Sequence, residues 1–272
     1  MNSERFLIFA LARTGSTSLM NLMNISKSIN LISEPFNKKN SLFLTTNNMD
    51  KFGKTEIKNL LDLKNELDVL INIYGYNGIK HVWHPSGFPF ENITEMNNFL
   101  SNYVSMNQHL LTFFDKVLFL NRKNVLKRIV SGLISMQTKV WEANIKIKTV
   151  EDKEFEFKEL DESSIVWFIE FEKFYVESFK NDLNVRKIDY YEIFFEDLFE
   201  DTILMEDKIK KCYEMYDFFD ASVDFNEDDL TKMNKILGPD LKLNDITTYL
   251  KIPNIYEIEE KFGSEENGYL LK

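Results

Sequence analysis

The sequence contains one cysteine, Cys212, so neither an intrachain disulfide nor a zinc cluster built from cysteines can form. The apolar stretch Phe6–Leu11 is too short for the hydrophobic core of a signal peptide. No apolar run reaches the length of about 18 residues that indicates a membrane-spanning helix. We therefore expect a cytoplasmic protein without a membrane span.

Positive charge is also in short supply. The chain has 33 lysines and arginines against 44 acidic residues, a net charge of −11, and only five of the basic residues are arginines. Such a surface does not attract nucleic acid or anionic lipid, because both require cationic groups that displace counterions. We expect no nucleic-acid partner, and any anionic ligand must be held by a local site.

Short apolar runs alternate with amphipathic segments along the chain. The predicted strands are Phe6–Leu11, Gly78–Val82, Lys116–Leu120 and Val185–Asp189. The predicted helices cover residues 16–26, 54–73, 91–112, 125–140, 163–180 and 192–198. This alternation predicts an α/β fold with a parallel sheet flanked by helices. We expect a single domain over residues 1–272, with 217–272 as a less regular C-terminal part of short helices and loops.

A loop rich in hydroxyl groups joins the first predicted strand to the first predicted helix, and it reads Arg13, Thr14, Gly15, Ser16, Thr17, Ser18. The N–H groups at the start of a helix bind anions, and the glycine, hydroxyl groups and guanidinium of this loop suit a phosphate. Alternatively, the glycine serves only a turn and the hydroxyl groups only cap the helix. The loop lacks the spacing and the lysine of a Walker A motif, which argues against ATPases and GTPases.

A second group of polar residues follows the third predicted strand. Arg122 comes just after the strand, and Ser131 lies nine positions further along the next helix. Ligands of open α/β sheets bind beyond the strand ends, so this pair suits a second phosphate. Two phosphate sites would fit a 3′,5′-bisphosphate nucleotide. Taken singly, Arg122 can equally pair with a surface carboxylate, and Ser131 can bond its own helix backbone.

Together these segments resemble the bacterial sulfotransferases of the trehalose and nodulation-factor type. In that family an Arg-Ser-Gly-Ser-Thr loop holds the 5′-phosphosulfate of the donor, and residues 13–17 are similar to it. An arginine and a serine at matching spacing hold the 3′-phosphate, with Gln-Thr-x-x-Trp behind them. The matching residues here are Arg122, Ser131, Gln137 and Trp141.

The resemblance extends over residues 5–195 and implies a P-loop-like parallel sheet within a single sulfotransferase domain. It implies transfer of a sulfuryl group from 3′-phosphoadenosine 5′-phosphosulfate (PAPS) to a hydroxyl of a carbohydrate or small metabolite, without a metal. Arg13 would stabilise the leaving phosphate, because a guanidinium can contact both phosphate and leaving oxygen. Members of this type can be dimers, which leaves a homodimer open.

Sulfuryl transfer also requires a base within reach of the acceptor hydroxyl. Glu34 is the first candidate, because it lies in a Glu-Pro pattern that the family has near the acceptor. The family's second glutamate, in Glu-Pro-x-Glu, is replaced here by Asn37. His84 is the alternative base, and Lys80, which would share one strand face with it, could help hold the sulfonate. A histidine in this context is often only a packed or loop residue.

Two other functions remain open from the sequence. A P-loop-related kinase would use the same strand, loop and helix, but it would need Mg²⁺ and a Walker lysine, and no acidic or histidine cluster has the spacing of a metal site. A degenerate, non-catalytic nucleotide-binding protein would explain the loss of the second glutamate at Asn37. Cys212 has no matching catalytic histidine, so we predict no role for it.

Overall fold

The computed structural model describes residues 4–35, 60–83, 110–140, 155–221, 225–238 and 246–272. Its centre is a five-stranded sheet in which each neighbouring pair of strands is parallel. The strands, in the order β2-β3-β1-β4-β5 across the sheet, are Leu31–Ser33, Gly78–Trp83, Phe6–Leu11, Lys116–Asn121 and Asp189–Phe194. The α/β fold with a parallel sheet is therefore confirmed.

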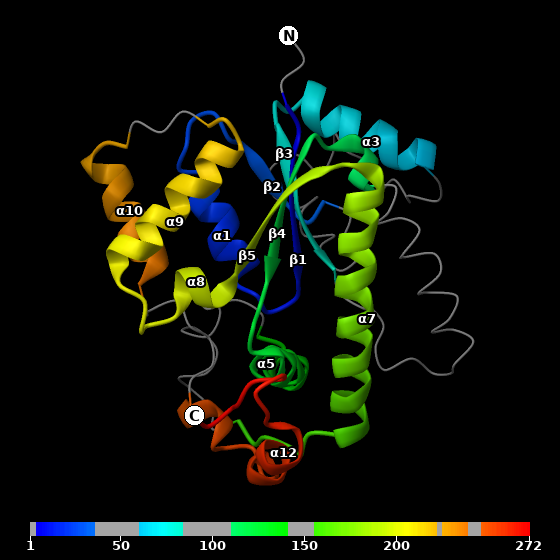
Figure 1. The fold of residues 1–272 in the computed structure, drawn as a ribbon, viewed down its shortest axis with the longest axis vertical. Coiled ribbons are helices and arrows are strands. Elements are labelled where there is room, and N and C mark those ends of the chain that lie inside the picture. Colours follow the sequence, from blue (N-terminus) through cyan, green and yellow to red (C-terminus); the bar gives the residue numbers. More distant parts are fainter. Residues whose placement is uncertain (1–3, 36–59, 84–109, 141–154, 222–224, 239–245) are drawn as a thin grey trace.

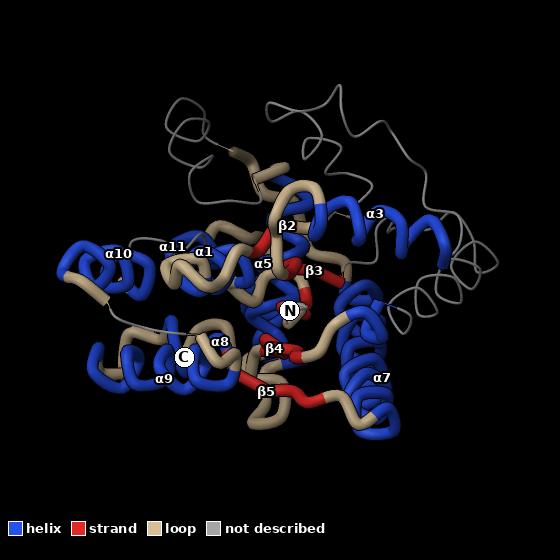
Figure 2. The backbone as a smooth tube through the Cα atoms, turned by 90° about the horizontal axis from the view of Figure 1, so that it is seen from above, coloured by secondary structure: helices blue, strands red, loops and turns tan. Residues whose placement is uncertain are grey.

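Helices cover both faces of the sheet (Figure 2). On one face lie α1 (Ser16–Met23), α9 (Met205–Phe218) and α10 (Glu227–Leu237), and on the other lie α3 (Leu60–Asn72) and α7 (Glu162–Arg186). The remaining helical segments are Leu111–Phe113 (η2), Val125–Thr138 (α5), Phe195–Phe199 (α8), Ile246–Tyr249 (α11) and Ile255–Phe262 (α12).

The central strand β1 explains why the sheet is covered on both sides. All of its side chains are buried, and successive side chains of a strand point to opposite faces. Ile8 and Ala10 pack with α1 and α9, whereas Leu7 and Phe9 pack with α3 and α7. Two apolar faces need two helical layers, so the continuous hydrophobic run favours a parallel α/β sheet.

Helix α5 lies beyond the carboxyl ends of β1 and β4, where Figure 1 shows it nearly end-on. Its apolar side chains pack with α11, α12 and the start of α7 in a separate cluster that includes Leu126, Ile129, Ile165, Tyr249 and Ile258. The C-terminal part of the chain therefore covers α5 from the side opposite the sheet, and α5 is held over the edge where the strands end.

The sequence-based prediction was wrong at the fifth strand. Residues 185 and 186 belong to the last turn of α7, where Val185 is 72% exposed, and α7 ends at Lys187 in a left-handed conformation. The strand therefore runs over Asp189–Phe194, and the helix predicted from residue 192 begins only at Phe195. The hydropathy of Val185 alone does not distinguish an exposed helix position from a buried strand position.

The other predicted strands and most predicted helices are confirmed to within a few residues. Strand β2 was not predicted. Residues 54–59 of one predicted helix and 91–109 of another lie outside the described part of the chain. After residue 226 the described elements are the helices α10, α11 and α12. No helix in the ranges that the structure describes is long and apolar enough to cross a membrane.

Cys212 gives a direct test of this packing. It lies on the inner face of α9, fully buried, and burial raises the pKa of its thiol to about 12. We expect iodoacetamide at pH 8 to label the folded protein at least about 100-fold more slowly than the unfolded protein, because the thiolate is the reactive species. Mass spectrometry in buffer and in denaturing guanidinium measures the ratio. Equal labelling rates would contradict the burial of α9 against the sheet.

Candidate anion-binding site

The loop after β1 turns sharply at the centre of the sheet edge. Arg13 and Gly15 both have positive φ, 68° and 79°, and a Cβ at Gly15 would lie 3.1 Å from the rings of two phenylalanines of α8. The Thr14 hydroxyl donates back to the Leu11 carbonyl at 2.7 Å, so it braces the turn and does not point to a ligand. The turn thus fixes where α1 begins.

The start of α1 presents unpaired backbone donors. The first backbone bond of the helix runs from Leu19 N–H to the Gly15 carbonyl at 3.0 Å, which leaves the N–H groups of residues 16–18 without intrahelical partners. No hydrogen bond within the described residues uses the hydroxyls of Ser16 or Ser18. These groups, together with the helix dipole, favour an anion at this position.

Backbone strain marks two of the predicted site residues. Five non-glycine residues of the described chain have positive φ. Lys139 and Lys187 cap the C-termini of α5 and α7, and Asp220 closes α9 in the same way. The other two, Arg13 and Glu34, follow the ends of β1 and β2 and cap no helix. Left-handed backbone costs of order 1 kcal/mol or more and concentrates at functional sites.

Arg13, Arg122 and Ser131 meet at this edge although they are far apart in the sequence. Arg13 Nε donates to Ser131 Oγ at 3.0 Å, and Arg122 Nη1 donates to the Arg13 carbonyl at 3.1 Å. Burial lowers the pKa of Arg13 to about 10, with a further contribution from the nearby Arg122, and burial also lowers the pKa of Arg122. Both side chains remain cationic at neutral pH, so the site concentrates positive charge.

One donor of Arg122 makes no hydrogen bond within the described residues. The guanidinium lies 4.2 Å from the centre of the Phe195 ring, and the donor in question is its buried Nε. Glu196 is 3.9 Å from that nitrogen, but its carboxylate accepts the backbone N–H groups of Lys123 and Asn124 at 2.9 and 3.0 Å. A buried donor of this kind is costly unless a ligand completes it.

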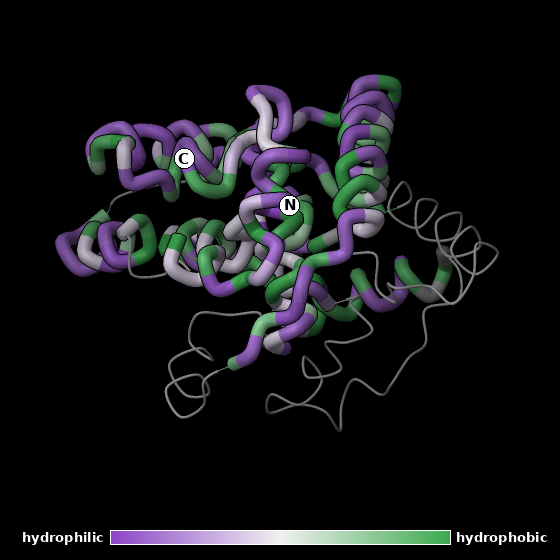
Figure 3. The backbone as a smooth tube through the Cα atoms, turned by 90° about the horizontal axis from the view of Figure 1, so that it is seen from below, coloured by the Kyte–Doolittle hydropathy of each residue, from purple (hydrophilic) through white to green (hydrophobic). Residues whose placement is uncertain are grey.

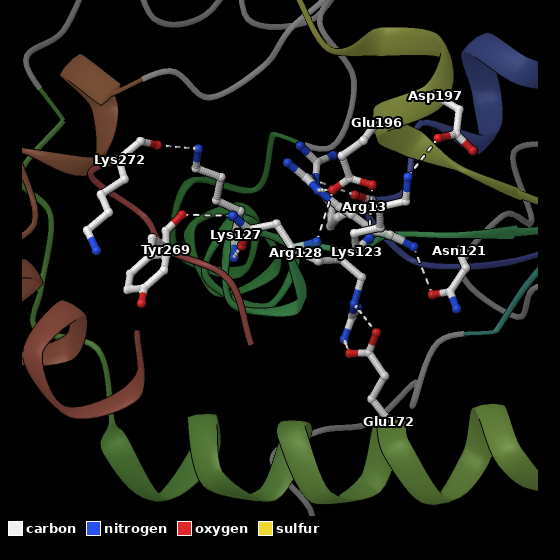
Figure 4. Close-up of polar contacts among 12 residues, drawn as sticks. Arg13, Asn121, Lys123, Lys127, Arg128, Glu172, Glu196, Asp197, Tyr269 and Lys272 are labelled. Atoms are coloured by element: carbon white, nitrogen blue, oxygen red, sulfur yellow. Dashed lines mark hydrogen bonds and ion pairs between the residues drawn. The ribbon is translucent and has the colours of Figure 1, made fainter. Parts of the chain in front are cut away.

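Arg128, which the sequence reasoning did not assign to the site, braces the loop from the other side. Its Nε donates to Glu172 at 2.8 Å, and its Nη2 contacts the second oxygen of the same carboxylate (Figure 4). Its Nη1 donates to the Ala12 carbonyl at 3.1 Å. Glu172 is 4% exposed. The pair therefore joins α5, α7 and the loop in the interior. The scarcity of arginine was the only sequence signal for it.

A second ionic group lies on the other side of the loop, around Lys80 of β3. Lys80 is 1% exposed, and its Nζ contacts Glu34 at 2.7 Å and donates to Thr17 Oγ1 at 3.0 Å. The Glu34 N–H also donates to the Lys80 carbonyl at 2.7 Å. Two predicted catalytic residues are thus brought to the first turn of α1, but Glu34 is already ion-paired.

Of the other predicted residues, the structure describes Gln137. Its side-chain amide donates to the Lys158 carbonyl at 3.1 Å and accepts from the Lys158 N–H at 3.0 Å, so it holds the segment before α7. Asn37, His84 and Trp141 lie outside the described residues. His81, next in the chain to Lys80, points to the opposite face of the sheet and packs 5.8 Å from the Phe9 ring.

Among the described residues, no group of three or more histidine, cysteine or acidic side chains is arranged to hold a metal ion. Searches against protein-family models, curated proteins and solved structures find no match for this chain. The fold and the site define an α/β protein with a group of cationic side chains at the carboxyl ends of its strands.

Replacing Glu172 tests how much the edge depends on the buried ion pair. Glu172→Ala should lower the free energy of unfolding by about 3–5 kcal/mol, because it leaves the Arg128 guanidinium buried and unpaired. Glu170→Ala, on the exposed side of the same helix, is the control and should change it by less than about 0.5 kcal/mol. Urea denaturation measures both. Similar values for the two variants would show that the pair does not support the fold.

Proposed function

We propose that this protein is a PAPS-dependent sulfotransferase that sulfates a hydroxyl group of a small acceptor. The observation that carries the proposal is the convergence of Arg13, Arg122 and Ser131 beside the open first turn of α1. Two cationic groups, a hydroxyl and free helix N–H groups at one sheet edge suit a ligand with several anionic oxygens. The choice of PAPS as that ligand follows from the resemblance of these segments to sulfotransferases.

The 5′-phosphosulfate would lie on the first turn of α1, against the N–H groups of residues 16–18 and the guanidinium of Arg13. The 3′-phosphate would accept a hydrogen bond from the Nε of Arg122, which makes none to the described residues, and would contact the Ser131 hydroxyl, which is 3.0 Å from Arg13 Nε. Arg13 stands between the two groups and would contact both. Binding of an anion would also offset the cost of keeping two guanidinium groups buried and close together.

The reaction would proceed by in-line transfer. The acceptor oxygen forms a bond to sulfur while the bond between sulfur and the 5′-phosphate oxygen breaks, and that electron pair stays on the phosphate. The products are the sulfated acceptor and 3′-phosphoadenosine 5′-phosphate (PAP). Arg13 would stabilise the charge that develops on the leaving oxygen, as positioned cations do in phosphoryl transfer.

The hydroxyl proton would pass to Glu34 or to His84. Glu34 has the advantage of position, because its carboxylate reaches the first turn of α1 through Lys80 and Thr17. A carboxylate at this place can accept the proton of an acceptor hydroxyl. Lys80 would also contact the sulfonate. The single cysteine and the net charge of −11 favour a cytoplasmic enzyme of small molecules.

Calorimetric titration with PAP, without metal, tests the nucleotide site. We expect binding in the micromolar range, weakened at least about tenfold in Arg122→Ala because a charged hydrogen bond is lost. Arg186→Ala removes the same charge from an exposed position on α7 and should bind normally. ATP in place of PAP should bind far more weakly. No binding of PAP by the folded wild type would overturn the proposal.

Turnover distinguishes an enzyme from a non-catalytic nucleotide-binding protein. Release of PAP from PAPS, measured with a panel of hydroxyl acceptors, should occur in the wild type and fall at least about 100-fold in Glu34→Gln, which removes the base. PAP affinity should change less than about threefold in the variant, because Glu34 does not contact the phosphates. Full turnover by Glu34→Gln would assign the base to another residue, and PAP binding without any turnover would identify the non-catalytic protein.

A further inference from the structure

A tyrosine from the C-terminal part of the chain lies beside the buried guanidinium groups of Arg13 and Arg122. Burial lowers the pKa of Arg122, and Tyr249 opposes this effect more strongly than Glu196, which is 3.9 Å from Arg122 Nε. Burial and Arg122 lower the pKa of Arg13 to about 10, and here too Tyr249 acts in the opposite direction. Electrostatic effects decline with distance, so the phenolic oxygen of Tyr249 is close to both guanidinium groups.

The ring of Tyr249 is held in the apolar cluster around α5. It belongs to α11, is 3% exposed, and packs in the same cluster as Leu126 and Ile129 of α5. Hydrophobic and hydrophilic residues alternate along the helices (Figure 3), and the apolar sides of α5, α12 and the start of α7 form this cluster. Moving the hydroxyl away from the two arginines would therefore require the core around α5 to repack.

The last residues of the chain fasten the C-terminal part to the start of α5. The Leu126 N–H donates to the Asn267 carbonyl at 2.8 Å, and Asn124 Nδ2 donates to the Tyr269 carbonyl at 2.8 Å. Gly268 has a φ of 81°, and a Cβ there would lie 2.4 Å from Asn124 Cγ, so the close approach requires glycine. Figure 4 shows Tyr269 beside α5. These contacts hold the segment in place without the hydroxyl of the α11 tyrosine.

A phenolic hydroxyl adds a kind of group that the two arginines lack. Guanidinium groups only donate hydrogen bonds, whereas a tyrosine oxygen can accept from a guanidinium while its proton is donated to an anion. Ser131 has this arrangement on Arg13, whose Nε donates to the serine hydroxyl at 3.0 Å. A hydroxyl also supplies a donor without adding charge, so it does not increase the repulsion between two buried cations.

We propose that Tyr249 is a further binding residue of the anion site, and that its hydroxyl donates a hydrogen bond to the 3′-phosphate, the group assigned to Arg122. For the identity of the nucleotide this inference rests on the proposed function. It places part of the nucleotide site in residues 246–272, outside the segments that resemble sulfotransferases.

Tyr249→Phe tests the proposal, because it keeps the buried ring and removes only the hydroxyl. Calorimetric titration compares PAP with AMP, which has the same base and 5′-phosphate but lacks the 3′-phosphate. We expect the variant to bind PAP at least about fivefold more weakly, since a hydrogen bond to a charged group is lost, and AMP within about twofold of the wild type.

Two further variants serve as second test and control, with the thermal midpoint as the check on folding. Tyr249→Met also lacks the hydroxyl, and its flexible side chain can fill the same space, so it should show the same loss of PAP affinity. Tyr256→Phe makes the same chemical change as Tyr249→Phe at a position of α12 that is 67% exposed, and it should bind both nucleotides as the wild type does.

Weaker PAP binding with normal AMP binding in the Tyr249 variants supports the inference. Equal weakening of PAP and AMP would show a general structural role, and unchanged PAP affinity would show that the hydroxyl does not reach the ligand; either result overturns it. If the wild type binds no PAP, the proposed function fails, and inorganic pyrophosphate then tests the anion site alone. Weaker pyrophosphate binding in Tyr249→Phe than in Tyr256→Phe would keep Tyr249 as an anion-binding residue. Equal binding, or none by the wild type, would overturn that assignment as well.

Discussion

Arg128 of α5 and Glu172 of α7 form a buried ion pair, and a further hydrogen bond from Arg128 to the Ala12 carbonyl connects both helices to the loop after β1. This contact fixes three elements relative to one another at the carboxyl edge of the sheet. It sets the position of Arg13 in the loop, the distance between α5 and α7, and hence the charged end of the cavity between them. Burying two charges is expensive, and their mutual contact keeps the cost acceptable only while both partners are present.

Around this support the protein gathers more positive charge than its overall composition suggests. The chain is acidic, yet three of its five arginines meet at one end of the sheet. Glu172 is ion-paired with Arg128, and the Glu196 carboxylate near Arg122 also accepts backbone N–H groups at the N-terminus of α5, so positive charge is concentrated around Arg13 and Arg122. An anionic ligand at the start of α1 would reduce the repulsion between these guanidinium groups, which supports the proposal of a nucleotide with two phosphate groups.

The two sides of the loop carry different groups. On one side, Lys80 and Glu34 reach the first turn of α1 through Thr17. On the other, Arg13 forms part of the cavity between α5 and α7, whose aromatic wall belongs to a column of rings on α7. Arg13 is the residue common to both sides, and its backbone has a positive φ of 68°.

Sequence alone determined the features that depend on neighbouring residues. The continuous apolar run of β1 and the glycine and hydroxyl residues after it predicted a buried strand, a tight turn and a helix start, because burial pattern and turn chemistry are local properties. It failed at β5, where Val185 lies on an exposed helix turn that only the end of α7 defines. The pairing of Arg128 with Glu172, the contact between Arg13 and Ser131 across 118 positions, and the cavity beside them were decided by the tertiary structure. These features arise where helices far apart in the chain pack over one sheet edge. The pattern of residues within a single segment cannot predict such contacts, because it holds no information on which distant segment lies beside it.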